Sequence, residues 1–147
     1  LLDTNPRAEL DVVKAKRDPQ MKAVEAGGLA EVMTTQMIPN YGHTGTDTPE
    51  LDALCLAMAL GLGGEVFLRQ SRALRDRPDQ CETLRALDGP ALILCGESDK
   101  PCPRDRHELM AELIPRATLQ IIEKAGHLTT LEKPDATNAA LARWLEE

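Results

Sequence analysis

Two residues in the C-terminal part of the sequence have side chains suited to acid–base chemistry. Asp99 lies in the stretch CGESD, four residues after Cys95, and His127 lies in KAGH, four residues after Glu123. A carboxylate that accepts the Nδ1–H of an imidazole fixes its tautomer and stabilises the imidazolium that forms when the ring takes up a proton. If their loops meet, Asp99 and His127 can therefore serve as the orienting acid and the base of a nucleophilic mechanism.

The segments around these two residues have the patterns that would bring them together. The predicted order is strand 91–95, helix 103–115, strand 117–123 and helix 133–147. This alternation predicts a parallel βαβα unit. In an open parallel sheet, the loops after the strands gather at one edge, so Asp99 and His127 should meet there. Gly96 and Gly126 would allow the tight backbone that such loops need.

The N-terminal part of the chain is mostly helical by pattern. Asn5 and Pro6 have the residue types of an N-cap and a first helical residue, and Pro19 is expected to interrupt the helix that follows. LLD, at the start of the chain, predicts a short strand. A helical block at residues 6–86 would therefore separate this strand from the other two.

One helix and one loop within this block have a distinct composition. Residues 49–64 are apolar on nearly every side, so this helix is expected to be buried against others. Residues 40–48, NYGHTGTDT, are polar and contain glycine, which predicts a loop. His43 in this loop is expected to be exposed to solvent.

The composition limits the partners that the chain can bind. Its 147 residues carry a formal net charge of -7, so phosphate groups would repel it and we expect no nucleic-acid partner. No apolar run reaches about 18 residues and no signal-peptide pattern is present, which predicts a cytoplasmic protein with no membrane partner. The cysteines lack C-x-x-C spacing and the histidines are scattered, so we predict no metal site and no cofactor.

Three stretches of the sequence resemble the α/β-hydrolase family. PALILCGESDKPCP resembles the strand and loop of the catalytic acid, IIEKAGHLTTLEKP the last strand and histidine loop, and LLDTNPRAE the strand before a helical cap. The order acid then histidine also fits the family. The resemblance implies an α/β class, as a partial α/β-hydrolase fold with parallel strands, flanking helices and a helical cap. It implies a core strand at residues 1–5, the cap and its connections at residues 6–86, and the C-terminal βαβα part of the core at residues 87–147.

The nucleophile motif of this family is missing from the sequence. G-x-S-x-G occurs nowhere, and neither Ser71 nor Ser98 follows a strand at an elbow. The resemblance therefore implies a truncated hydrolase that holds two triad positions, Asp99 as acid and His127 as base. We expect the complete parent protein to be a serine esterase-type hydrolase of small apolar or acyl substrates, and this chain alone to be inactive. The expected partners are a small-molecule substrate and either the missing N-terminal half or another copy of the chain.

Other functions and residue roles fit the same sequence. A relative with an aspartate nucleophile, which hydrolyses epoxides or removes halides, would keep His127 as the base that activates water. A non-catalytic module would instead use the cap and half-sheet to bind a partner. Asp3 is an alternative acid, at the end of the first predicted strand. Cys95 and Cys102 are expected to pack as small apolar side chains, and Glu132 to complement the dipole at a helix N-terminus.

Overall fold

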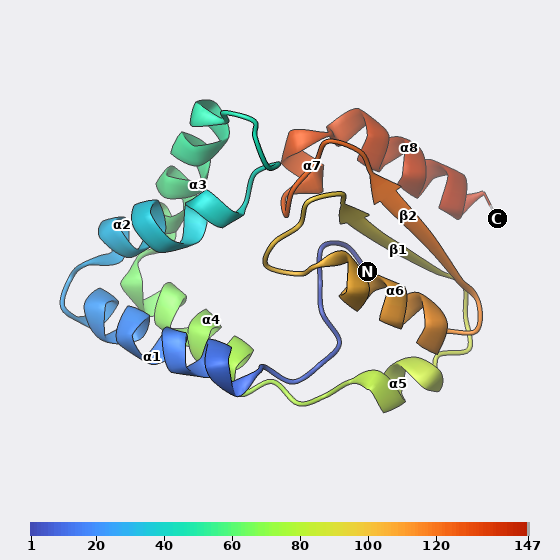
Figure 1. The fold of residues 1–147 in the computed structure, drawn as a ribbon, viewed down its shortest axis with the longest axis horizontal. Helices are drawn as coiled ribbons and strands as arrows, with labels where there is room; N and C mark the ends of the chain where they lie inside the picture. The colour runs from blue at the N-terminus through green and yellow to red at the C-terminus, as the bar shows by residue number, and fades with distance from the viewer. Residues whose placement is uncertain (147) are drawn as a thin grey trace. The chain divides into compact units, whose positions relative to one another are not determined.

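The computed structural model describes residues 1–146 of the chain. Glu147 lies outside the described residues. It belongs to the predicted last helix and to the predicted unit at residues 87–147. In chain order the elements are α1 (Asp11–Glu25), α2 (Leu29–Val32), the π-helix η1 (Met33–Met37), the 3-10 helix η2 (Ile38–Asn40), α3 (Pro49–Leu62), α4 (Gly64–Arg75), α5 (Cys81–Arg85), β1 (Ala91–Gly96), α6 (Arg104–Leu113), β2 (Ala117–Ile122), α7 (Thr129–Glu132) and α8 (Pro134–Leu145) (Figure 1).

The chain divides into two compact units, and the first contains the sheet. It consists of Leu1–Pro6, Asn40–Asp47 and the chain from Gln80 onward. Within it β1 and β2 pair in parallel along their full lengths. The two predicted strands, and the helices predicted after each of them, are confirmed to within two residues at the described ends.

The two faces of this sheet are covered by different helices, as the α6 and α8 ribbons in Figure 1 show. One face packs against α6 through Ala91, Ile93, Met110 and Ile114. The other packs against α8 through Leu92, Leu94, Ile122 and Ala140. Side chains alternate between the faces of a strand, so burial of both faces explains the continuous apolar run of β1. Each buried Leu or Ile contributes about 1.5–3 kcal/mol to this core.

The start of the chain extends the sheet by less than a strand. Leu2 forms an isolated parallel bridge with Leu94, where a strand was expected over residues 1–5. Leu94 N–H donates to Leu1 O at 2.9 Å, and Asp3 N–H donates to Leu94 O at 2.9 Å. Asp3 then adopts a left-handed φ of 45°, which turns the backbone away from the sheet.

The second unit consists of Arg7–Pro39 and Thr48–Asp79, and its elements are helical. The described residues between Pro6 and Ala86 contain no strand. Its core is formed by side chains from α1, α2, η1, α3 and α4, together with Ile38 of η2. The buried apolar residues are Met21, Val24, Leu29, Val32, Met33, Ile38, Cys55 and Leu68.

The predicted start of the first helix was wrong, and so was the predicted interruption at Pro19. Helix α1 begins at Asp11 and contains Pro19. Local propensity at Pro6 is overridden by partners that are distant in sequence. Pro6 O accepts the Gln80 N–H at 2.8 Å, and the buried Glu9 carboxylate binds the guanidinium groups of two arginines, Arg17 and Arg77.

The expectation that α3 is buried was also wrong. Among the described residues of α3, Cys55 alone is buried. Four large apolar side chains of this helix, Leu54, Met58, Leu60 and Leu62, are 44% to 58% exposed. Within residues 1–146 no single helix has the length and apolar character to cross a membrane, and α3 and α4 meet that test only as a pair bent by 100°.

Candidate active site

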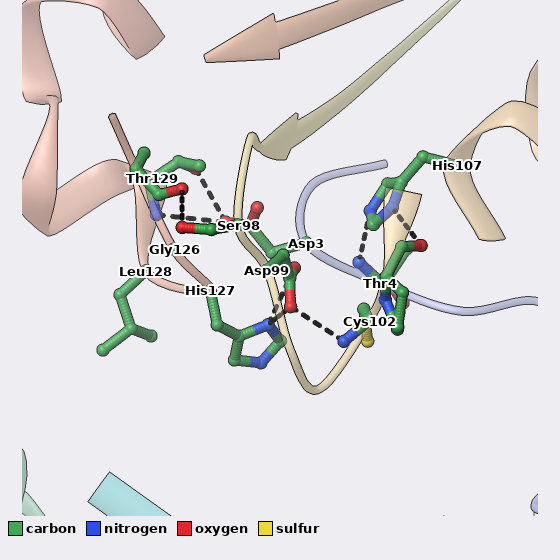
Figure 2. Close-up of polar contacts among 12 residues, drawn as sticks. Asp3, Thr4, Ser98, Asp99, Cys102, His107, Gly126, His127, Leu128 and Thr129 are labelled. Carbon is green, nitrogen blue, oxygen red and sulfur yellow. Dashed lines mark hydrogen bonds and ion pairs between the residues drawn. The ribbon is translucent and has the colours of Figure 1, made fainter. Parts of the chain in front are cut away.

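The loop at residues 97–103, which follows β1 and is called the acid loop, meets the loop at residues 123–128, which follows β2 and is called the histidine loop. Nδ1 of His127 lies 3.0 Å from both carboxylate oxygens of Asp99 (Figure 2). A carboxylate accepts hydrogen bonds, so this contact places the ring proton on Nδ1. In the neutral ring Nε2 then carries the lone pair, on the ring edge that points away from Asp99. The structure thus brings together the two residues that the sequence predicted to meet.

The two members of this pair differ in their access to solvent. The side chain of Asp99 is 0% exposed and that of His127 is 21% exposed. Oδ1 of Asp99 also accepts the backbone N–H of Cys102 at 2.8 Å. A buried carboxylate needs such donors in place of water. The buried carboxylate is therefore held against an imidazole that remains accessible to solvent.

Two glycines allow the backbones of three loops to come this close. A Cβ atom at Gly96 would lie 2.0 Å from Gly126 O, and one at Gly126 would lie 2.3 Å from Tyr41 O. Real side chains do not tolerate such distances to backbone atoms. The acid loop, the histidine loop and the loop at residues 40–47 can therefore meet only with glycine at these two positions.

We expect Gly96→Ala to destabilise the protein by about 3 kcal/mol, because the added methyl group meets rigid backbone in a packed region. Gly61 is the matched control, since a Cβ there would meet nothing within 4 Å. It lies inside α3, so Gly61→Ala should stabilise the protein by up to about 1 kcal/mol. Urea unfolding of both variants measures the difference. Equal stabilities would contradict the close approach of the three loops.

Asp3, the alternative acid, has its hydrogen bonds elsewhere. Its Oδ2 accepts the N–H and the hydroxyl of Thr129, at 3.2 and 2.7 Å. Within the described residues its Oδ1 is buried with no hydrogen-bond partner. Burial raises the pKa of Asp3, and the two bonds from Thr129 act in the opposite direction. The geometry therefore favours Asp99 over Asp3 as the partner of His127.

Two candidate nucleophiles, Ser98 and Cys95, have surroundings that do not suit attack on a substrate. Ser98 Oγ lies 2.6 Å from Nδ1 of His43. The expectation that His43 is exposed was wrong, because its ring is partly buried against Ser98. Cys95 is fully buried, and burial raises the pKa of its thiol to about 12. Cys95 therefore stays a packed, protonated thiol, as predicted.

Glu132 was predicted to complement the dipole at a helix N-terminus, and it does lie in the first turn of α7, but its carboxylate also binds groups outside that helix. Its Oε1 accepts the Gly126 N–H at 2.8 Å, and its Oε2 accepts the His43 N–H at 2.8 Å. These partners lie in the histidine loop and in the loop at residues 40–47. The nearby sequence could not reveal the second of them, because it lies 89 residues away.

His107 is a residue that the sequence interpretation missed. It is fully buried, its Nε2 accepts the Thr4 N–H at 3.1 Å, and its Nδ1 donates to Pro103 O at 3.4 Å. Burial lowers the pKa of His107, so the ring is held in its neutral form. His107 lies three residues before the apolar Met110 on the same helix, and residues at that spacing share one helix face. This spacing was the signal that could have indicated the burial of His107.

The stability of the protein should depend on pH through His107. Its pKa is lowered in the folded state from the ordinary 6.5, so below about pH 6.5 the unfolded chain binds a proton that the folded chain does not. The free energy of unfolding should therefore fall as the pH decreases through that value. His107→Gln removes the titration and should reduce the fall. Urea unfolding of both proteins at about pH 8 and about pH 5.5 tests this, and an equal fall would contradict it.

Within residues 1–146, no group of three or more His, Cys, Asp and Glu side chains is arranged to hold a metal ion. The residues at the strand ends can instead move a proton at Nε2 of His127. Such a base has a catalytic use only beside a nucleophile or a bound water.

Comparison with known proteins gives the family. Residues 56–134, more than half of the chain, match the alpha/beta hydrolase fold family. The chain belongs to the α/β-hydrolase family, and its architecture is a partial α/β-hydrolase fold, as predicted from the sequence.

Several relatives are similar over most or part of the chain. A thermophilic esterase from Thermogutta terrifontis matches with a TM-score of 0.90 and 30% identity, over 99% of this chain and 54% of its own. An enol-lactonase from Burkholderia xenovorans LB400 shares the fold, with a TM-score of 0.81 and 20% identity, over 100% of this chain and 55% of its own. A homoserine O-acetyltransferase from Salinibacter ruber (strain DSM 13855 / M31) is 37% identical over 71 residues, which are 48% of this chain and 20% of that protein. The chain thus spans about half the length of the two matched structures, and its 71 matched residues span a fifth of the curated relative.

Proposed function

We propose that this chain is the acid and histidine part of a longer serine hydrolase that cleaves esters of small acyl substrates. The observation that carries the proposal is the Asp99–His127 pair, with its acid buried and Nε2 facing away from that acid. This is the arrangement that a base needs in order to activate a hydroxyl nucleophile.

In this proposal the nucleophile and the oxyanion donors come from residues outside this chain. G-x-S-x-G is absent from the 147 residues, and Ser98 and Cys95 have other partners or are buried. The relatives of known structure are nearly twice as long, which leaves room for a second half that carries the nucleophile. A complementary N-terminal half is therefore the proposed partner.

The proposed mechanism uses each residue in one role. Nε2 of His127 takes the proton of the serine hydroxyl as the oxygen attacks the ester carbonyl, and Asp99 stabilises the imidazolium that results. The imidazolium then gives the proton to the leaving alcohol as the carbon–oxygen bond breaks. Water repeats the two steps in order to release the acid and free the serine.

The composition of the chain and the names of similar proteins both support small acyl substrates. Aromatic residues make up only 2% of the chain, and the apolar side chains of the helical block are mostly aliphatic or thioether, which favours aliphatic groups over stacked rings. The names of the similar proteins, an esterase, an enol-lactonase and an O-acetyltransferase, all describe chemistry at an acyl carbon. An ester or lactone of a short acid fits both.

The test is to assay the complete protein against a series of p-nitrophenyl esters of increasing acyl length. We expect hydrolysis to be fastest for short chains and to proceed without an added alcohol. Turnover only when a hydroxyl acceptor is added would indicate an acyltransferase instead. Halide or diol release without ester hydrolysis would indicate an aspartate nucleophile, and no turnover of any substrate would favour a binding module.

A further inference from the structure

The carboxylate of Glu132 accepts backbone N–H groups from two separate loops. Oε1 accepts from Gly126 at 2.8 Å and from Leu128 at 3.3 Å, the two residues that flank His127. Oε2 accepts from His43 at 2.8 Å. One side chain thus connects the histidine loop to the loop at residues 40–47.

The loop at residues 40–47 in turn holds the backbone of His127. Tyr41 O accepts the His127 N–H at 2.7 Å, so the N–H groups of residues 126, 127 and 128 are all bound. The same loop reaches the acid loop, where Ser98 Oγ accepts the Thr44 N–H at 3.1 Å and lies 2.6 Å from the His43 ring. The acid loop, the histidine loop and the loop at residues 40–47 therefore form one hydrogen-bonded network.

We propose that Glu132 is a positioning residue for His127. The Glu132 carboxylate holds the histidine loop at the distance from Asp99 that catalysis requires. This inference rests on the proposed function and adds a residue to its machinery. Glu132 lies on the short helix α7, and it binds the backbone N–H groups on either side of the ring, through which it acts.

The chemistry of the three partners explains why a carboxylate stands at this position. All three are N–H donors, and a carboxylate has two oxygens that both accept. Glutamine has the same shape, but its amide nitrogen would place a donor against at least one N–H group. No Lys or Arg among the described residues forms an ion pair with Glu132, so its charge acts on the backbone donors alone.

The test compares Glu132→Gln with Glu123→Gln in the complete protein. Glu123 is an exposed carboxylate four residues before His127, so the control removes the same charge from the same loop. In Glu132→Gln we expect the amide hydrogens that face the new amide nitrogen, either that of His43 or those of Gly126 and Leu128, to exchange about ten times faster or more, because a lost hydrogen bond lowers the cost of local opening. We also expect the NMR signal of the His127 Nδ1 proton to shift, because its distance to Asp99 changes. Glu123→Gln should leave both measurements unchanged.

In the kinetics of Glu132→Gln we expect kcat to change much more than KM. kcat for the ester should fall by about 10- to 100-fold as the base is misplaced, while KM changes by less than about threefold. Unchanged amide exchange and an unchanged Nδ1 signal would overturn the proposal, whatever the activity. If the complete protein hydrolyses no ester, the proposed function fails, while exchange and the Nδ1 signal still decide whether Glu132 holds the loop.

Discussion

His127→Ala in the complete protein is expected to lower kcat/KM for an activated ester by about 10⁴- to 10⁶-fold. The reason is that Nε2 of this ring is the proposed base for the nucleophile and the proposed acid for the leaving alcohol. Without it, only substrate binding and the oxyanion donors would remain to speed the reaction. The measurement is the initial rate with a short p-nitrophenyl ester, together with circular dichroism to show that the variant is folded.

His107→Gln is the matched control for the loss of an imidazole. The ring of His107 is buried against Thr4 and Pro103 and has no bond to Asp99 or His127 among the described residues. Its replacement should change kcat/KM by less than about tenfold, although it affects stability. Similar losses in the two variants would show that His127 matters for folding rather than for proton transfer.

Asp99→Asn should have the second largest effect, a fall of about 10⁴-fold in kcat. The amide of asparagine can place N–H donors where Asp99 now accepts from the His127 ring and from Cys102 N–H, so the imidazole would turn or take the wrong tautomer. Asp3→Asn is the matched control. Its hydrogen bonds go to Thr129, so we expect its kcat to stay within about tenfold of the unsubstituted protein.

The comparison of these two variants decides which carboxylate serves the histidine. A larger loss of kcat in Asp3→Asn than in Asp99→Asn would show that Asp3, and not Asp99, is the carboxylate that serves His127. The variants should be compared by kcat at one fixed pH, so that the substituted carboxylate is the only difference between the assays.

The strands and the meeting of Asp99 with His127 could be predicted because their signals are local. The apolar run of β1 encodes burial on both faces, and two parallel strands bring the loops that follow them to one edge. The geometry of the pair therefore follows from strand order and loop length. Side-chain contacts with distant residues were not needed to predict it.

Two contacts that the sequence could not reveal join residues that are far apart in the chain. Glu132 and His43 are 89 residues apart, and His107 is 103 residues from Thr4. No local pattern reports such contacts. The same cause accounts for the wrong helix start at Pro6, whose carbonyl is bound by Gln80 N–H. The exposure of α3 could not be foreseen either, because an all-apolar helix is ordinarily buried.

The central claim is that this chain supplies the base for a serine that lies outside its 147 residues. A fluorophosphonate probe tests it most directly, because an activated serine oxygen displaces fluoride and forms a stable phosphorus–oxygen bond. The complete protein should be labelled once, on a serine in a peptide from outside this chain, and His127→Ala should prevent the labelling. A label on Ser98 or Ser71, or ester hydrolysis with no serine labelled, would contradict the claim.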